Sequence, residues 1–220
     1  MRNWVETLIA HELAYSFLSK VFYEPPSTTL IDTLATEALF DAWPLETDQS
    51  EAQIGLRLLQ QFCASWQHEA DLEALQQDYL RLFVGPGRLL AAPWESVYRS
   101  PDHLLFAEQT IQVRQAYQRF GMPIPHLHSE PEDHLGLELR FVAFLCALGL
   151  KAIDENQSAI VDAVLTEVRR FQSDHLLQWA PECLHRVIEK ASSDYYRGCA
   201  HLTLGCLIHS NEVLGLETAR

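Results

Sequence analysis

The chain has 220 residues, of which 48% are hydrophobic and 21% are charged, and its formal net charge is −14. This composition is typical of a globular protein with one sizeable core, and it excludes disordered and fibrous classes. The charge excludes nucleic acid as a partner, because phosphate binding requires a basic face. We therefore expect a single domain that spans residues 1–220.

The acidic charge is concentrated in the first third of the sequence. Residues 1–78 carry three basic and thirteen acidic side chains, whereas residues 79–150 carry six and seven. Residues 151–220 carry seven basic and ten acidic side chains. The middle third is therefore nearly neutral, so burial or ligand binding costs least there.

Helical periodicity dominates the sequence. A first stripe of apolar residues runs from Trp4 to Phe22 and stops at Pro25 and Pro26. Further helices are expected over about 27–39, 54–66, 72–83, 102–120, 131–149, 155–176, 182–191 and 194–214. No alternating β-branched run is bounded by hairpin turn residues. The predicted fold is an all-α, single-domain helical bundle.

Residues 84–101, VGPGRLLAAPWESVYRSP, interrupt the helical pattern. The segment contains two glycines and three prolines, yet it also carries large apolar side chains. Loops normally lie at the surface and expose what they carry, so a long apolar loop between two central helices is unusual. Either the loop packs under helices as a plug, or it lines a groove. The residues favour the plug slightly and leave the groove open.

Cysteine usage and the longest apolar stretch indicate the compartment. The five cysteines are scattered and form no C-x-x-C pair, which argues for a reducing environment. Glu6 and Glu12 interrupt the apolar residues near the start, so this segment is not a signal peptide. The longest apolar stretch, residues 141–150, is too short to span a bilayer. We expect a cytoplasmic protein without stable membrane insertion.

Residues 126–141, HLHSEPEDHLGLELRF, place several ionisable side chains before an apolar run. One hypothesis is a metal-dependent hydrolase whose ligands are His126, His128, Asp133 and His134, because histidine and carboxylate groups are the usual zinc ligands. However, the sequence contains no H-E-x-x-H motif. We therefore expect no metal here, and the hydrolase stays as an alternative.

The same segment also reads as the start of a helix. Ser129 and Glu132 have the spacing of a capping box, and Pro131 is tolerated in a first helical turn. The catalytic templates that we compared do not match, since the sequence lacks a phosphate-binding P-loop and a nucleophile elbow. We expect no catalytic residues and no cofactor.

Two segments together resemble the TorD/DmsD family of redox-enzyme maturation chaperones. Residues 79–98, YLRLFVGPGRLLAAPWESVY, resemble the family's aromatic-x-x-Leu-Phe-x-Gly-Pro stretch followed by Pro-Trp-x-Ser-Val-aromatic. Residues 130–139, EPEDHLGLEL, resemble its Glu-Pro-x-Asp-His signature. The resemblance is strong over residues 75–148 and looser over the rest of the chain.

The resemblance implies an all-helical cytoplasmic chaperone that is not an enzyme. Its partners would be the twin-arginine leader peptide and the apo form of a molybdoenzyme catalytic subunit, held for cofactor insertion before export. The residues that match the family's leader-binding positions are Tyr79, Leu82, Phe83, Pro93, Trp94, Asp133 and His134. At position 87 the chain has glycine, whereas some members of the family carry tryptophan there. A scaffold that grips the mature part of a client, without binding leaders, is a further alternative.

A twin-arginine leader joins two cationic side chains to an apolar segment, and the chain offers a match for each. Burial of a large apolar side chain contributes about 1.5–3 kcal/mol, whereas an exposed charge pair contributes only about 0.2–1 kcal/mol. The apolar loop should therefore supply most of the affinity, and carboxylates such as Asp133 should select arginine. We also consider two roles for His134: either it orients the neighbouring carboxylate of Asp133, or, when protonated near pH 6, it competes with the leader's arginines.

Overall fold

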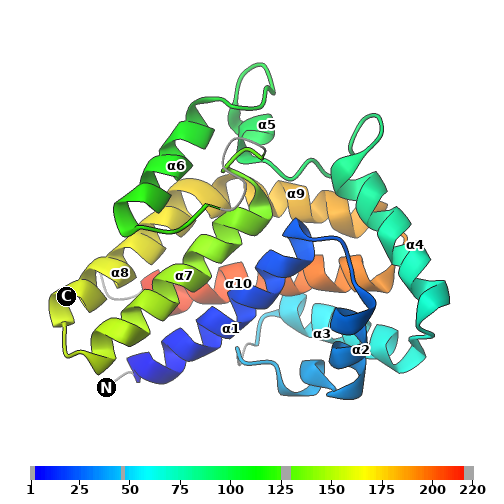
Figure 1. Cartoon of the computed structure of the whole chain (residues 1–220), viewed down its shortest axis with the longest axis horizontal. Coiled ribbons are helices and arrows are strands. Elements are labelled where there is room, and N and C mark those ends of the chain that lie inside the picture. The colour runs from blue at the N-terminus through cyan, green and yellow to red at the C-terminus, as the bar shows by residue number, and fades with distance from the viewer. Residues whose placement is uncertain (1–2, 46–47, 125–129, 216–220) are drawn as a thin grey trace. The chain divides into compact units, whose positions relative to one another are not determined.

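The structure is a computed structural model that describes residues 3–45, 48–124 and 130–215 (Figure 1). Its α-helices are α1 Trp4–Tyr23, α2 Thr28–Thr36, α3 Ser50–Ser65, α4 Glu69–Tyr79, α5 Glu95–Arg99, α6 Glu108–Phe120, α7 Leu135–Asp154, α8 Ser158–Phe171, α9 Leu177–Lys190 and α10 Asp194–Gly215. A 3-10 turn, η1, spans Leu39–Ala42, and π-helical turns η2 and η3 span Leu80–Val84 and Gln172–Leu176. Over these residues the only β-structure is one isolated bridge. The all-α prediction is confirmed.

The chain forms two compact units, and each unit is built from segments that are not contiguous. Unit 1 comprises Met1–Tyr23, Trp94–Ala180 and Ser210–Arg220, and unit 2 comprises Glu24–Pro93 and Pro181–His209. Each unit therefore combines an early part of the chain with a late part. The expectation of one domain over residues 1–220 stays a prediction.

In unit 1, α1 and α7 lie side by side (Figure 1). A Cβ atom on Gly136 would lie only 2.6 Å from Cβ of Tyr23 and 2.9 Å from the backbone oxygen of Ser19. Further along α7, a Cβ atom on Gly149 would lie 3.0 Å from the side chain of Leu8. Glycine at these two positions therefore allows the two helices to pack closely.

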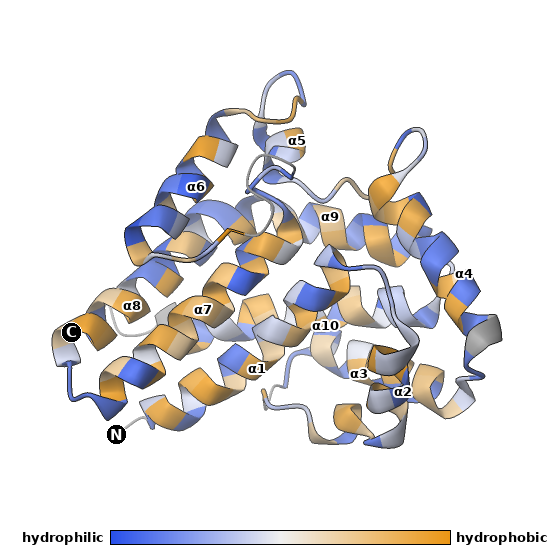
Figure 2. Ribbon diagram, viewed as in Figure 1, coloured by the Kyte–Doolittle hydropathy of each residue, from blue (hydrophilic) through white to orange (hydrophobic). Residues whose placement is uncertain are grey.

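An aromatic cluster joins the other helices of unit 1. Tyr117 of α6, Phe141 of α7 and Phe171 of α8 are buried, and the ring centroid of Phe141 lies 4.9 Å from that of Tyr117 and 4.8 Å from that of Phe171. Each such pair contributes about 0.5–1.5 kcal/mol beyond the area it buries. Figure 2 shows the corresponding apolar stretches of α7 between more hydrophilic turns of α6 and α8. These ring contacts hold α6, α7 and α8 together.

In unit 2, glycines bring the backbones of α3 and α10 together. A Cβ atom on Gly55 would lie 2.5 Å from the backbone nitrogen of Leu202, and one on Gly205 would lie 2.5 Å from that of Ala52. Both distances are shorter than real Cβ contacts. The two helices therefore cross at a separation that only glycine permits at these positions.

Asp78, at the end of α4, fixes the start of α10 within unit 2. Its buried carboxylate accepts hydrogen bonds from the backbone N–H of Ser192 at 3.0 Å and of Ser193 at 2.9 Å. The Ser193 hydroxyl donates a third hydrogen bond at 2.8 Å. A carboxylate at this place satisfies free N–H groups and complements the positive end of the helix dipole.

Helix α7 begins later than the sequence predicted, and the predicted capping box is wrong. Its N-cap is His134, whose Nδ1 accepts a hydrogen bond from the backbone N–H of Gly136 at 3.0 Å. Glu132 instead accepts two hydrogen bonds from the guanidinium of Arg114, at 2.7 and 2.8 Å. Ser129 lies outside the described residues. The pairing partner of Glu132 is 18 positions away, so local spacing does not show it.

Two further boundaries differ from the predictions for physical reasons. Helix α6 begins at Glu108 rather than at residue 102, because His103 and Phe106 have φ values of 53° and 60°, which a right-handed helix cannot include. The short helix α5 lies inside the segment that was expected to be a loop. Asp133 accepts a hydrogen bond from the backbone N–H of Ser96 in its first turn, which stabilises this helix start.

Candidate functional site

The two sequence motifs meet in unit 1 at Trp94 and His134. These residues form an isolated antiparallel β-bridge, and the backbone N–H of Glu95 donates to the backbone oxygen of Asp133 at 2.9 Å. The Trp94 and His134 rings pack edge to face, with centroids 5.9 Å apart. Tyr23 also packs edge to face on His134, at 5.3 Å. Residues that are 40 positions apart in the sequence thus form one junction.

Asp133 is a buried structural group in this junction. Its Oδ2 accepts a hydrogen bond from the backbone N–H of Ser96 at 2.7 Å, and its Oδ1 accepts one from the hydroxyl of Thr110 at 2.8 Å. The residue has no exposed surface. Asp133 therefore joins the segment before α7 to α5 and α6. Its direct pairing with a leader arginine stays a prediction, and it would require the junction to open.

His134 is neutral in the folded protein. Burial lowers the pKa of its imidazole to about 3, because the charged form would be desolvated. Its Nδ1 is also occupied as an acceptor at the N-terminus of α7. The hypothesis that His134 becomes protonated near pH 6 and competes with arginine is therefore wrong.

Glu130 is the partly exposed acid of the EPEDH segment. Its neighbours Glu132 and Asp133 are buried and paired, whereas Glu130 is half-buried and accepts a hydrogen bond from the indole N–H of Trp94 at 2.7 Å. The pKa of Glu130 is raised above its usual value, because burial and the charge of Asp133 outweigh the opposing effect of the hydrogen bond from Trp94. The sequence analysis placed Glu130 in the Glu-Pro-x-Asp-His signature but did not select it as a leader-binding residue. Its exposure depends on contacts that no local pattern shows.

A second layer of buried carboxylates supports the junction. Glu95 interacts through Oε1 with the guanidinium of Arg99, and its Oε2 lies 2.9 Å from Nδ1 of His175. Glu138 accepts a hydrogen bond from the indole N–H of Trp179 at 3.2 Å. Burial, and then the nearby charge of Glu95, raise the pKa of Glu138 well above its usual value. Burial and the nearby charge of Glu95 therefore favour the protonated form of Glu138.

In unit 2, the predicted residues of the first motif form a core cluster. Tyr79, Leu82 and Phe83 are buried, and the ring centroids of Tyr79 and Phe83 lie 5.5 Å apart. Tyr196 of α10 packs on both rings, at 6.2 and 5.7 Å. In this structure the three residues therefore shape the turn and expose little surface to a ligand.

The side chains that turn η2 exposes are the neighbours of this cluster. Leu80 is 45% exposed and Val84 is 56% exposed, so both offer apolar surface to a ligand. The loop that follows returns onto the turn, since the N–H of Ala91 donates to the backbone oxygen of Leu82 at 3.0 Å. Ala91 and Pro93 are buried and Leu90 is partly exposed. The loop thus combines the packing of a plug with an exposed apolar edge.

The seven predicted site residues are divided between the two units. Trp94, Asp133 and His134 are brought together in unit 1, whereas Tyr79, Leu82, Phe83 and Pro93 belong to unit 2. Gly87 has a φ of 103°, and a Cβ atom there would meet nothing within 4 Å. Leu80, Val84 and Glu130 are the candidate contact residues that the sequence reasoning did not select.

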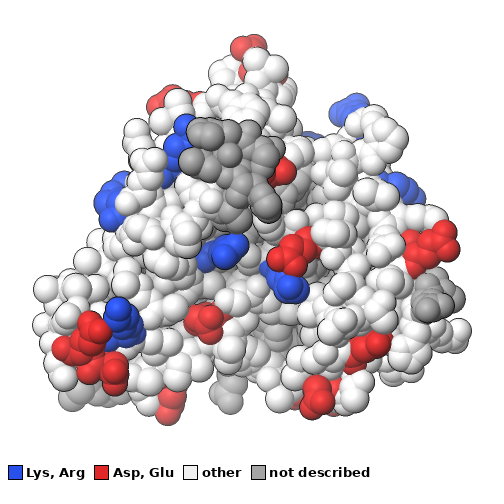
Figure 3. Space-filling model, in the orientation of Figure 1, with Lys and Arg blue, Asp and Glu red and all other residues white. Residues whose placement is uncertain are grey.

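The described residues contain no group of three or more histidine, cysteine and acidic side chains that could hold a metal ion. Of the four ligands in the hydrolase hypothesis, His126 and His128 lie outside these residues. Asp133 and His134 are engaged with backbone N–H groups and with Thr110. On the face shown in Figure 3, acidic and basic side chains are interspersed, and the residues described there form no continuous basic surface.

Comparison with known proteins gives one family and consistent relatives. The family model of the nitrate reductase delta subunit matches residues 46–185, which is more than half of the chain. The chain belongs to this family. The resemblance to TorD/DmsD chaperones is confirmed by relatives that carry those names.

Two relatives align with this protein over most of its length. The Tat proofreading chaperone DmsD of Salmonella typhi is 27% identical over 185 residues, covering 84% of this chain and 81% of the relative. The chaperone protein TorD of Vibrio cholerae is 29% identical over 204 residues, covering 91% and 84%. Both names describe chaperones, so the chain is a member of a chaperone family.

A solved structure supports the fold. A crystal structure of an Archaeoglobus fulgidus protein assigned to redox enzyme maturation aligns with a TM-score of 0.53 at 18% identity, over 88% of this chain and 92% of that one. At this identity the similarity concerns the fold alone. Within the part of the chain that the structure describes, none of the helices has the length and apolar character needed to cross a membrane.

Proposed function

We propose that this protein is a cytoplasmic chaperone, without catalytic activity, that binds the twin-arginine leader of a molybdenum-cofactor oxidoreductase. It would hold the apoenzyme for cofactor insertion before export. The names of its relatives support the chaperone role. The observation that carries leader binding is the junction in unit 1, where a half-buried carboxylate, Glu130, lies against the half-buried indole of Trp94.

Glu130 is suited to an arginine of the leader. A guanidinium can pair with a carboxylate through two parallel hydrogen bonds, and such charge-assisted bonds are stronger than neutral ones. The oxygen Oε1 of Glu130 accepts from Trp94, which fixes the orientation of the group. An aromatic face beside the carboxylate can also stabilise the cation, by about 0.5–2 kcal/mol.

Unit 2, taken by itself, carries a second candidate contact surface, which suits an apolar segment. Leu80 and Val84 lie four positions apart on turn η2 and are both exposed, and Leu90 follows on the loop. Such side chains gain about 25 cal/mol for each Å² of apolar area that a bound segment covers. Tyr79, Leu82 and Phe83 keep the role of leader-binding residues in this proposal by holding the turn in shape. The ordering of a flexible leader offsets part of the gain. We therefore expect a micromolar Kd, which corresponds to a binding free energy of about −8 kcal/mol.

The test is a calorimetric titration of the purified protein with synthetic twin-arginine leaders. Glu130→Gln should weaken binding about three- to tenfold, because it removes the charge but keeps the acceptor for Trp94. The matched control is Glu155→Gln, since Glu155 lies at the far end of the 20-residue helix α7 and pairs with Lys151 at 3.8 Å. That control should bind like the wild type.

A second arm separates arginine recognition from general charge. A leader whose two arginines are replaced by lysine should bind more weakly to the wild type, and Glu130→Gln should then have a smaller effect. Absence of saturable binding to any leader would refute the proposal. Binding to a leaderless client, with none to the isolated leader, would favour the assembly scaffold.

A further inference from the structure

Unit 1 contains a polar pocket that the chaperone role does not use. The pocket has a volume of about 480 Å³, within the range of sites for small molecules. Three arginines contribute to its lining, Arg99 from α5, Arg119 from α6 and Arg170 from α8. Such a concentration of guanidinium groups stands out in a chain with a net charge of −14.

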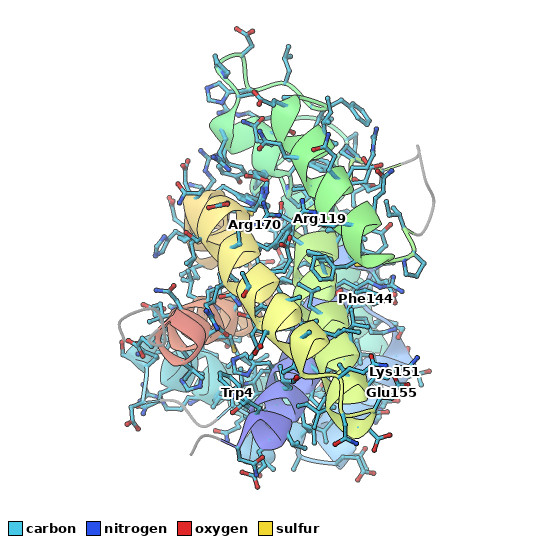
Figure 4. The ribbon with its side chains drawn as sticks, turned by 90° about the vertical axis from the view of Figure 1, so that its left-hand side faces the viewer. Trp4, Arg119, Phe144, Lys151, Glu155 and Arg170 are labelled. Atoms are coloured by element: carbon cyan, nitrogen blue, oxygen red, sulfur yellow. The ribbon has the colours of Figure 1, made fainter. Side chains whose placement is uncertain are left out.

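Two of these arginines converge on one buried carboxylate. Arg170 donates from Nε and one terminal nitrogen to Glu167, at 3.0 and 2.7 Å, and Arg119 donates from one terminal nitrogen at 3.1 Å. Figure 4 shows Arg119 and Arg170 near each other on their two helices. Glu167 is buried, whereas the side chain of Arg119 is 48% exposed. The carboxylate therefore orients the two cations and leaves N–H groups of Arg119 for a ligand.

Arg99 is held from the other side of the pocket. Its guanidinium pairs with the buried Glu95 and donates to the backbone oxygen of Asp174 at 2.7 Å. The side chain is 31% exposed, so it also retains accessible N–H groups. Each arginine of the pocket is thus positioned by a buried carboxylate behind it, which reduces the entropy that binding costs.

The charge balance limits the kind of ligand. Three guanidinium groups face three carboxylates, of which Glu95 and Glu167 are buried behind the arginines and Asp174 is exposed in the lining. Glu167 pairs with two guanidinium groups and Glu95 with one, so the three arginines and these two buried carboxylates together carry an excess of one positive charge. One oxyanionic group can use that excess, whereas a second oxyanionic group would meet no further uncompensated cation and would be repelled by Asp174.

The neutral side chains of the pocket offer acceptors for hydrogen-bond donors on a ligand. Gln112 donates its amide N–H to Glu108 at 2.9 Å, and Gln178 donates to the backbone oxygen of Ser173 at 2.8 Å. Their amide oxygens then remain as acceptors, as does the carboxylate of Asp174. A ligand that satisfies both sets of groups carries an oxyanion together with hydroxyl groups.

We propose that this pocket binds a small polar molecule with one oxyanionic group, a carboxylate or a phosphate monoester, beside hydroxyl groups. The oxyanion accepts hydrogen bonds from Arg99 and Arg119, and the hydroxyls donate to Gln112, Gln178 and Asp174. This site is independent of leader binding, so either function can fail without the other.

The experiment is calorimetric titration of the full chain, at low ionic strength and in a buffer without carboxylate or phosphate. The probes are glycerate and glycerol 3-phosphate, with glycerol as the neutral control. Saturable binding of glycerate identifies a carboxylate site, and saturable binding of glycerol 3-phosphate identifies a phosphate site. Arg119→Gln should lower the affinity for whichever probe binds by about tenfold. Glu167 keeps its two hydrogen bonds from Arg170 in this variant.

The matched control is Arg57→Gln, which removes the same charge from an exposed arginine of α3 in unit 2. It should leave the affinity unchanged, and thermal unfolding should show that both variants are folded. The proposal is overturned if neither probe binds saturably, or if both variants lose affinity equally. Pyrophosphate binding more tightly than glycerol 3-phosphate would also overturn it, because the charge balance predicts a single oxyanion.

Discussion

The Trp94–His134 junction of unit 1 and turn η2 of unit 2 carry the two family motifs, and they are stabilised in opposite ways. The junction buries polar groups, and each oxygen of Asp133 accepts a specific hydrogen bond. Turn η2 buries the rings of Tyr79 and Phe83 against Tyr196. In both regions, however, most motif residues are buried and their neighbours are exposed. In this protein, therefore, most residues of the two motifs support a surface rather than form it.

The largest expected effect tests the aromatic side of this comparison. Phe83→Ala should lower the free energy of unfolding by about 3–5 kcal/mol, because it leaves a cavity beside Tyr79 and Tyr196. Leu80→Ala, in the same turn but 45% exposed, should cost less than about 1 kcal/mol. Urea unfolding at 25 °C measures both. Equal losses would mean that Phe83 is not a core residue.

Asp133→Asn tests the polar side. The amide has one oxygen where the carboxylate has two, so either Ser96 N–H or the Thr110 hydroxyl loses its acceptor. The expected cost is about 1–3 kcal/mol of unfolding free energy. Asp102→Asn, at an exposed acid, should be neutral within about 0.5 kcal/mol. If Asp133→Asn kept full stability and lost only leader affinity, direct pairing with arginine would be the better description.

His134 gives this region an acid sensitivity. Burial lowers its pKa to about 3, whereas the unfolded chain binds a proton below about pH 6.5. The unfolded state therefore binds more protons between these values, and stability falls as the pH is lowered through this window. His134→Asn keeps an N-cap and removes the titration.

The loss of unfolding free energy between pH 7 and pH 5 should consequently be about 2 kcal/mol smaller in His134→Asn than in the wild type. Denaturant unfolding at the two pH values gives this difference. The matched control is His185→Asn, which makes the same replacement at an exposed histidine of α9. If the two variants had the same pH dependence, a different group would control the acid sensitivity.

The smallest effects concern the loop after turn η2. Gly87→Ala should cost about 1 kcal/mol, through its φ of 103° alone, since a Cβ atom there meets nothing within 4 Å. Gly85→Ala should cost more, because its φ is similar and its Cβ would lie 3.3 Å from the backbone nitrogen of Gly87. Thermal unfolding of the pair tests this order. The reverse order would indicate that Gly87 is packed rather than open.

The sequence predicted the fold where the signals are local. The stripe from Trp4 to Phe22 became α1, and Ser27 caps α2 by accepting a hydrogen bond from the N–H of Leu30. It did not predict α5, whose start depends on Asp133, 37 positions from Ser96. For the same reason it selected the buried Asp133 rather than the half-exposed Glu130. The composition of a site was readable from the motifs, but the exposure of each member depends on distant partners.

The discontinuous build of the two units has a consequence for biosynthesis. Helix α1 leaves the ribosome before the other segments of unit 1, yet the residues that complete this unit extend to Ala180 and include Ser210. The Tyr15 hydroxyl, for example, donates to Ser210 across 195 positions at 2.8 Å. Contacts of such separation form slowly, and they cannot form before most of the chain has been synthesised. The nascent helix α1 must therefore keep its apolar face unsatisfied through most of translation, and a chaperone for other proteins is itself exposed to aggregation during its own synthesis.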